Sequence, residues 1–282
     1  MNNVVRNNSA GFLALPAILV VTIFLFIPFA VIFQNSMTIP SEGGFAWSVK
    51  NYTTILGDSF YWEIIIRTLR ISLITTAAAL LLGYPAAMYL YFSKSRWRRV
   101  FLFVVVSPLF ISVIVRTYGW LIIFAPSGAL NAMLPEALQF PIYKTETAIV
   151  IGLMHIYIPF MVLALNASMA KIDGRFLSAA YSLGASRVMA FRDIMLPLSR
   201  PGILSGTIVV FSVSMTAFST PVLLGGSSNK TMAYIIYQKN ILLANDHEGG
   251  ALAIILLLLA MVSLTVFNTI GDAAARRRGG AR

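Results

Sequence analysis

The amino-acid sequence predicts an all-α polytopic membrane protein with six transmembrane helices. Of its 282 residues, 58% are hydrophobic and only 11% are charged, a balance that a soluble domain of this size could not carry without exposing large apolar patches. Six apolar stretches make up about half of the chain, and each reaches the roughly 20 residues that a helix needs to cross a bilayer core. The six stretches are 12–33, 71–92, 100–125, 148–170, 202–224 and 250–270.

The distribution of charge orients these spans. An even number of spans puts both termini on one side, and that side carries 14 of the 21 basic residues against three acids. The other side carries six basic residues and seven acids. Because basic loops stay inside, both termini are expected in the cytoplasm. Orientation explains the net charge of +11, so membrane lipid is expected as a partner and nucleic acid is not.

The spans also divide the chain into three parts. Residues 1–70 hold the first span and an extracytoplasmic loop, residues 71–270 a five-helix core, and residues 271–282 a basic cytoplasmic tail. The first apolar stretch, of 22 residues, exceeds the roughly 7 to 15 of a cleaved signal and is expected to be retained. The absence of cysteine excludes disulfides and thiolate metal sites.

The loop between the fourth and fifth spans, residues 171–201, is predicted to form two short helical segments. Gly184 could allow a turn or the close approach of another backbone, and the second segment is expected to stop near Pro197. Apolar residues recur at three- and four-residue spacing, which is typical of an amphipathic helix. These residues are Phe176, Ala180, Leu183, Gly184, Val188 and Phe191.

This loop resembles the cytoplasmic signature of membrane subunits of binding-protein-dependent ABC importers, Glu-Ala-Ala-x3-Gly-x9-Ile-x-Leu-Pro. Ser178 replaces the family glutamate, and the matching residues are Ala179, Ala180, Gly184, Ile194, Leu196 and Pro197. The resemblance implies the type I importer permease fold, with the loop acting as a coupling helix that docks on an ATPase subunit. The alternative is an amphipathic helix that only anchors the loop at the membrane surface.

The residues around 107–120 and 152–162 also resemble the spermidine/putrescine permease branch of that family. The resemblance implies a bacterial cytoplasmic (inner) membrane protein that forms half of a pore. Its implied partners are an ABC ATPase dimer, a second permease subunit expected to be a different chain, and an extracytoplasmic solute-binding protein. Polyamine is the favoured substrate, while an opine, an amino-acid derivative, a phosphonate or ferric ion stays open.

The chain itself offers no site for ATP. Its nearest imitation of a phosphate loop, at 225–231, has Leu224 at the first glycine position and Asn229 where glycine should precede the lysine. We therefore expect no enzyme activity, metal or cofactor in this chain, with ATP and Mg bound by the partner ATPase. Two alternatives from other classes are an ion-coupled secondary carrier and a non-transporting membrane scaffold.

Polar and aromatic residues within the spans are candidates for the translocation path. Arg116, the formal charge inside a predicted span, could serve a gate, a carbonyl or aromatic clamp or a substrate-facing charge, or could snorkel to the interface. His155 is expected to be a neutral packed or hydrogen-bonded side chain. Tyr118, Trp120, Tyr157 and Phe218 could bind ammonium groups by cation–π attraction.

A row of hydroxyl residues in the fifth span, Ser205, Ser212, Thr216 and Ser219, should share one helical face. This row is expected either to line a wet path or a subunit interface, or to pack with its hydroxyls bonded back to the backbone. Four prolines are expected to favour bends because each removes a helical hydrogen bond. They are Pro85, Pro108, Pro159 and Pro221.

Overall fold

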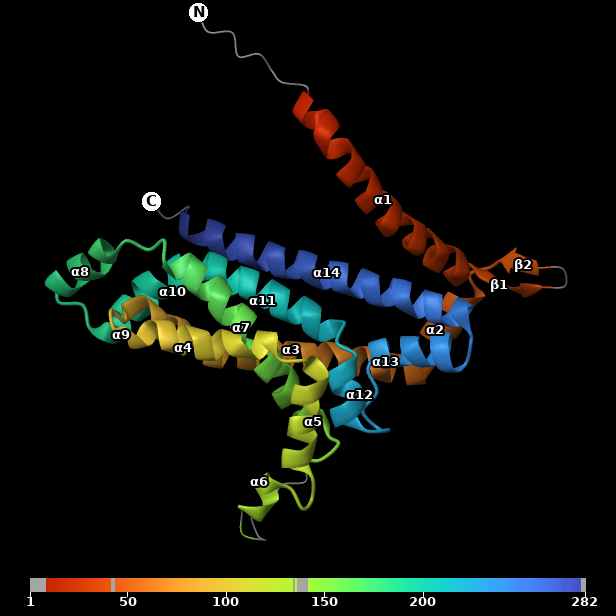
Figure 1. Cartoon of the computed structure of the whole chain (residues 1–282). Helices are drawn as coiled ribbons and strands as arrows, with labels where there is room; N and C mark the ends of the chain where they lie inside the picture. Colours follow the sequence, from red (N-terminus) through yellow and green to blue (C-terminus); the bar gives the residue numbers. More distant parts are fainter. Residues whose placement is uncertain (1–8, 42–43, 134, 136–141, 280–282) are drawn as a thin grey trace, which may run out of the picture. The chain divides into compact units, whose positions relative to one another are not determined.

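The computed structural model describes residues 9–41, 44–133, 135 and 142–279, with side chains from residue 15 to residue 271 (Figure 1). In this part of the chain, five helices are long and apolar enough to cross a membrane, or six if a pair bent by 63° counts as one span. The predicted all-α polytopic fold is confirmed. Most of the predicted basic tail at 271–282 lies outside the described side chains.

The chain forms two compact units. The first comprises Met1–Ser59 with Ile236–Ile255, and the second comprises Phe60–Ile235 with Leu256–Arg282. Helix α14 (Asp246–Gly279) therefore begins in the first unit and ends in the second.

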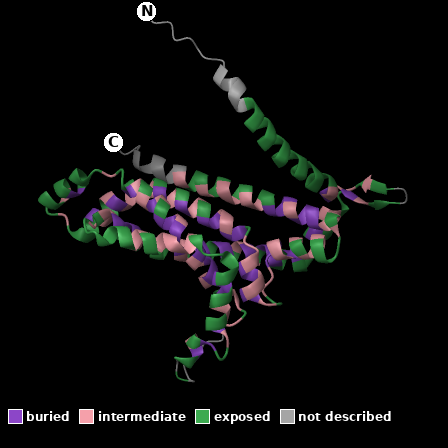
Figure 2. Ribbon diagram, in the orientation of Figure 1, coloured by how far each residue is buried: buried purple, intermediate pink, exposed green. Residues whose placement is uncertain are grey.

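The first unit begins with the long apolar helix α1 (Ser9–Ser36). Its side chains are exposed from residue 15 to residue 34 (Figure 2), as expected for a helix whose surroundings are lipid. A two-stranded antiparallel hairpin of β1 (Thr38–Ser41) and β2 (Gly44–Trp47) follows, and then α2 (Lys50–Gly57). A π-helical turn, η4 (Gln238–Leu242), precedes α14.

The second unit contains the elements that position the candidate site. In chain order they are α3 (Ser59–Phe92), α4 (Trp97–Val106), η1 (Ser107–Phe110), α5 (Val113–Phe124), α6 (Ala129–Ala132), α7 (Glu146–Met169), α8 (Gly174–Ser182), α9 (Arg187–Ala190), η3 (Phe191–Met195), α10 (Leu196–Leu198), α11 (Arg200–Met215), α12 (Ser219–Gly225) and α13 (Met232–Tyr237).

The core of this unit is built around α7. Half of its apolar stretch is buried (Figure 2), and α11 packs along it (Figure 1). Met161, Leu165 and Met169 on α7 lie in one buried cluster with Ala79 on α3 and Val210 on α11. Three predicted spans thus meet in a single apolar core.

Two glycines allow α7 and α11 to approach each other closely. A Cβ added at Gly202 would lie 2.5 Å from Ser168 Cβ and 3.0 Å from the Ala164 carbonyl oxygen, which are fixed atoms. A Cβ at Gly206 would instead meet Met161 Sδ, the movable end of a flexible side chain, at 2.6 Å. This spacing, Gly-x-x-x-Gly, is a recurrent means of packing helices in membranes.

The third predicted span is interrupted, so the expectation of one continuous helix over 100–125 is wrong. Helix α4 ends at Val106, and a 3-10 turn and two extended residues precede α5. Pro108 stands at the start of that turn and cannot donate a backbone hydrogen bond. The bend expected at this proline is therefore present and breaks the helix.

The fifth predicted span is also two helices. Helix α11 ends at Met215 and α12 begins at Ser219, so the predicted helix over 202–224 is broken at 216–218. Pro221 lies in the first turn of α12, where its missing N–H leaves no internal hydrogen bond unmade. By contrast, α3 and α7 continue through Pro85 and Pro159.

A group of ion pairs joins the N-terminal parts of α3 and α7. Glu146 accepts from Arg67 Nε at 3.2 Å and from Arg70 Nη2 at 2.5 and 2.6 Å. Arg67 also pairs with Glu63 and donates to the Ser228 carbonyl oxygen at 2.9 Å.

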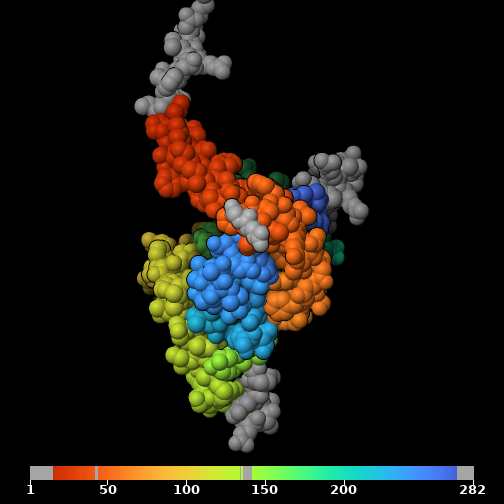
Figure 3. All heavy atoms as spheres, turned by 90° about the vertical axis from the view of Figure 1, so that its right-hand side faces the viewer, coloured from red at the N-terminus to blue at the C-terminus, as the bar shows by residue number. Residues whose placement is uncertain are grey.

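Helix α12 packs against α5. Figure 3 shows the cyan surface of α12 and its following loop lying against the yellow-green surface of α5.

The contact of α7 with α11 leads to a prediction of stability. We expect Gly202→Ala to lower the free energy of unfolding by about 1 to 3 kcal/mol, because the new methyl group forces the two helices apart. Gly206→Ala should cost less, since the Met161 side chain can move. Thermal unfolding of the purified protein in detergent measures both. Gly119→Ala is the control, because nothing lies within 4 Å of a Cβ at that position, and a loss there equal to that of Gly202→Ala would contradict the prediction.

Candidate functional site

Residues 174–198 form a compact segment that we call the coupling segment. It comprises α8, a turn, α9, the π-helical η3 and α10. Asp173 caps α8 by accepting from the Arg175 backbone N–H at 2.9 Å, and Ser186 caps α9 by accepting from Met189 N–H at 3.2 Å. These caps satisfy backbone donors that would otherwise lack partners.

Gly184 makes the turn between α8 and α9. Its φ of +84° lies in the left-handed region, and the N–H groups of Gly184 and Ala185 donate to the carbonyl oxygens of Tyr181 and Ala180, both at 3.0 Å. This pattern is a Schellman motif, which favours glycine because other residues are strained there. No atom lies within 4 Å of a Cβ at Gly184. Of the two roles expected for this glycine, the turn is the one that the structure supports.

The inner face of the coupling segment is anchored in the core. Leu177 on α8, Ala190 on α9 and Met195 on η3 are buried in the cluster that contains Met161 and Leu165 of α7. A displacement of the segment would therefore be transmitted to the membrane helices.

The exposed outer face of the coupling segment carries large apolar side chains among charged and polar ones. Leu183 is 89% exposed, Val188 74% and Phe176 58%. The spacing of apolar residues in the sequence predicted that these three side chains share one face of the segment. In the single chain, these side chains are not covered by the core. An exposed apolar patch on a connecting segment is typical of a protein docking surface.

The signature residues fall on both faces. Ser178, in place of the family glutamate, is exposed, and its hydroxyl donates to the Gly174 carbonyl oxygen at 3.2 Å. Ala179 is exposed. Gly184 is exposed as well, whereas Ala180, Ile194, Leu196 and Pro197 are partly buried. Ile194 and Leu196 pack against the core.

The second helical segment ends near Pro197, as the sequence predicted, because α10 stops at Leu198 and the chain bends by 63° before α11. It widens into the π-helix η3 and continues through α10 to Leu198, with Leu196 N–H bonded to the Phe191 carbonyl oxygen. Pro197 cannot donate to the carbonyl group four residues earlier, and its ring clashes with it. A π-turn accommodates a proline at this point because it moves that carbonyl out of register.

A buried hydrogen bond that the sequence did not predict joins the turn between α10 and α11 to α3. Tyr84 Oη and Ser199 Oγ are 2.8 Å apart, and the Tyr84 ring packs edge-on against Phe191. The two hydrogen-bonded residues are separated by 115 positions in the chain. A tyrosine in an apolar stretch was the sole signal, since a buried hydroxyl usually has a partner.

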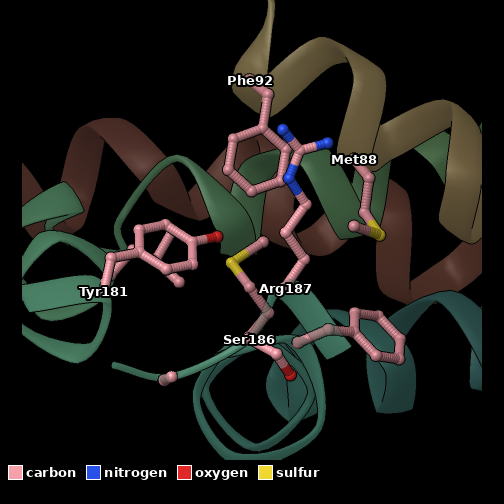
Figure 4. A pocket seen from close by; sticks show the side chains of 9 residues that line it. Met88, Phe92, Tyr181, Ser186 and Arg187 are labelled. Carbon is pink, nitrogen blue, oxygen red and sulfur yellow. The ribbon is translucent and has the colours of Figure 1, made fainter. Parts of the chain in front are cut away.

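A cavity of about 780 Å³ lies between the coupling segment and the end of α3. Tyr181, Arg187, Met88 and Phe92 extend their side chains around it (Figure 4). Its remaining lining is mainly apolar, from Leu177, Ala185, Ser186, Phe191 and Met195. Space of this kind leaves the coupling segment room to move relative to α3.

A second group of candidates meets beside the break between α11 and α12. Trp120 Nε1 donates to His155 Nδ1 at 3.1 Å, and Tyr157 Oη donates to the Val213 carbonyl oxygen at 3.2 Å. Arg116 is 9% exposed and lies within electrostatic range of His155 and Tyr157. Burial by its own chain argues against the snorkelling alternative for Arg116.

Other path candidates lie apart from this group. Tyr118 is 49% exposed on α5, away from the buried Arg116 and Thr117. Phe218 is partly buried at the N-cap of α12. Thr117 and Thr220, which the sequence did not single out, bring their hydroxyl oxygens within 3.2 Å of each other and join α5 to α12.

The row of hydroxyl residues does not form a continuous face. Ser205, Ser212 and Thr216 donate to backbone carbonyl oxygens three or four residues earlier, at 3.2, 2.7 and 3.1 Å. Ser219 lies beyond the break, on α12. Of the expected alternatives, bonding back to the backbone is the one seen for these three hydroxyls.

Comparison with known proteins agrees with this architecture. Residues 79–279 match the family described as "Binding-protein-dependent transport system inner membrane component". The chain belongs to this family. It is therefore an inner-membrane component of an ABC transport system, as the signature in the coupling segment implied.

Individual relatives point the same way. The chain is 32% identical over 256 residues to the "Spermidine/putrescine transport system permease protein PotB" of Escherichia coli (strain K12), covering 87% of this chain and 91% of that protein. It is 33% identical over 227 residues to the protein of that name from Haemophilus influenzae, covering 79% of each chain. A bacterial ABC transporter for the import of the acidic polysaccharide alginate has the same fold, with a TM-score of 0.76 at 19% identity over 95% of this chain and 96% of that one.

The turn at Gly184 leads to a prediction of local stability. Gly184→Ala should weaken the Schellman motif by about 1 to 2 kcal/mol, because a Cβ strains the left-handed conformation. Hydrogen exchange of the amides of residues 184 and 185 should then be faster. Gly184→Asn should retain most of the protection, since asparagine tolerates this conformation. Gly174→Ala is the matched control, with nothing within 4 Å of its Cβ and no positive φ; unchanged exchange in Gly184→Ala would contradict the prediction.

Proposed function

We propose that this chain forms one half of the membrane pathway of an ATP-driven polyamine importer, and that the coupling segment receives the ATPase subunit. The observation that carries the proposal is the division of the coupling segment into a buried inner face and an exposed outer face that carries large apolar side chains. Leu183 and Val188 are free to enter a partner, while Leu177 and Met195 hold the segment to the helices that must move.

Partners supply the remaining functions. An ABC ATPase dimer binds ATP and Mg and hydrolyses the nucleotide, a second permease subunit completes the path, and an extracytoplasmic binding protein delivers the solute. Both termini of this chain lie in the cytoplasm, on the side of the basic loops. This arrangement follows the family signature and the charge distribution of the sequence.

The proposed substrate class rests on the relatives and on the chemistry near the break in the fifth span. Putrescine and spermidine are cations, and the two curated relatives above are named as spermidine/putrescine permeases. Trp120, Tyr157 and Phe218 offer aromatic faces near the break, which attract ammonium groups by roughly 0.5 to 2 kcal/mol. The six predicted spans contain no Asp or Glu, so carboxylates for the substrate come from a partner.

Uptake into proteoliposomes tests the proposed function. The vesicles contain this chain with its ATPase and second membrane subunit, ATP inside, and binding protein with labelled putrescine or spermidine outside. Uptake should require both ATP and the binding protein. ATP-dependent uptake of another solute, such as an opine or a phosphonate, would keep the mechanism and replace the substrate, whereas uptake without ATP would overturn the mechanism.

The docking surface makes a separate prediction. Leu183→Asp places a charge in the proposed apolar interface and should weaken ATPase binding by about tenfold or more, as expected for a central interface residue. Co-purification and titration of the ATPase against the detergent-solubilised membrane subunits measure this binding. Ser95→Asp is the control, because it adds the same charge to another cytoplasmic loop and can still accept the Trp97 N–H that Ser95 Oγ accepts. Equal effects of the two variants would contradict a docking role for Leu183.

The hydrogen bond between Tyr84 and Ser199 should affect coupling more than binding. Tyr84→Phe removes the bond that joins α10–α11 to α3 and should lower the number of solutes imported per ATP by about two- to twelvefold, in keeping with a loss of about 0.5 to 1.5 kcal/mol. ATPase binding should be unchanged. Tyr89→Phe, on the same helix and 42% exposed, is the control, and an unchanged transport ratio in Tyr84→Phe would contradict this coupling role.

A further inference from the structure

Arg116 is a buried cation whose nitrogens have no hydrogen-bond partner among the described residues. It lies on α5 with 9% exposure, and its Nε and Nη1 atoms are enclosed without an acceptor. Arginine stays protonated at every physiological pH, so it cannot relieve the cost by losing its charge. A buried charge without a partner is strongly destabilising.

The neighbours of Arg116 do not balance its charge. His155 Nδ1 already accepts from Trp120, so a neutral His155 turns an N–H donor, Nε2, to its surroundings. Tyr157 Oη is engaged with the Val213 carbonyl oxygen. Neither side chain is an anion. The polar surroundings orient the guanidinium without neutralising it.

No acid within the predicted spans of this chain can fill that role. The nearest carboxylate in sequence on the packed elements is Glu146, at the N-terminal end of α7, where it is paired with Arg67 and Arg70. A polyamine carries positive charge and cannot neutralise a guanidinium. No carboxylate in the part of the chain that the structure describes therefore supplies the missing anion.

The position of Arg116 indicates where that anion enters. The next residue, Thr117, meets Thr220 of α12, and Tyr157 meets Val213 of α11, so the guanidinium lies at the break between these two helices. Nε and Nη1 are enclosed without an acceptor, and Nη2 is the guanidinium nitrogen that does not belong to this enclosed set. Breaks of this kind inside membranes are tolerated where they face protein or a water-filled cavity.

We propose that Arg116 forms an ion pair, through Nη2, with a carboxylate of the second membrane subunit. This inference rests on the proposed function, since it requires that subunit. Arg116 is then a positioning residue that holds an acidic side chain of its partner beside the break in the fifth span. A guanidinium suits this role because its fixed geometry binds a carboxylate with directional hydrogen bonds.

Double neutralisation tests the pair in the complete transporter. Arg116→Met removes the charge at similar length and leaves the partner carboxylate unpaired. Each Asp or Glu in the spans of the second subunit is then replaced by Asn or Gln, alone and together with Arg116→Met. We expect each member of the true pair, changed alone, to lower recovery of the two-subunit complex and the uptake rate by about tenfold, and the double change to restore both to within about threefold.

A conservative variant, a control variant and a readout without transport make the test specific to the charge of Arg116. Arg116→Lys, which retains the charge, should recover more complex than Arg116→Met. Arg67→Met is the control, because the acids of Arg67 lie on this chain and no change in the second subunit should rescue it. Complex recovery is read without transport, so a failure of the proposed substrate would not obscure the result.

Two outcomes would overturn the proposal. In the first, no carboxylate of the second subunit rescues Arg116→Met, so that every combination is additive. In the second, the loss in Arg116→Met is confined to solutes that themselves carry a carboxylate, which would assign the anion to the substrate. Wild-type uptake in the same vesicles reports separately on the proposed importer function.

Discussion

The close approach of α7 and α11 is the contact on which the rest of the second unit depends. In a lipid environment the hydrophobic effect does not drive helices together, so packing at small residues must do so. Gly202 and Gly206 remove the side chains that would hold the two helices apart. The coupling segment lies between the C-terminal end of α7 and the N-terminal end of α11, and it packs Met195 against α7. The position of the candidate docking surface therefore follows from this helix pair.

Hydrogen bonds between helices stabilise the second unit in addition to the close packing of α7 and α11. Tyr84 meets Ser199, Thr117 meets Thr220, and Tyr157 meets the Val213 carbonyl oxygen. Two of these bonds join an element near a break or turn to a continuous helix, α3 or α7, and the third joins α5 to α12. Polar groups are costly in an apolar medium unless paired, so each pair specifies one arrangement of the helices. Arg116, whose charge has no counterpart in the described part of the chain, is the exception that points to another subunit.

Local patterns in the sequence predicted the fold class and the coupling segment well. Apolar stretches report directly on membrane helices, and the spacing from Ala179 to Pro197 fixes the order of short elements. A bend was expected at Pro108, but the end of the helix at Val106 and the break after Met215 were not predicted, because hydropathy does not distinguish one helix from two that bend within an apolar stretch. The pairing of Tyr84 with Ser199 was missed for a different reason: it depends on which residues of distant helices face each other, and a single sequence does not carry that information.

The π-helix from Phe191 to Met195 has a consequence for how the coupling segment can vary. A π-turn accommodates one residue more than an α-helix of the same course. Removing one residue from this π-turn would restore regular α geometry along the same course. Removing one residue from an α-helical part of the segment would instead rotate everything before it by about 100° relative to α11. Leu183 and Val188 would then face another direction without any change in their chemistry. The number of residues between Leu183 and α11 thus sets the direction in which the docking surface faces. The α-helical parts of the coupling segment should therefore tolerate substitutions more readily than insertions or deletions.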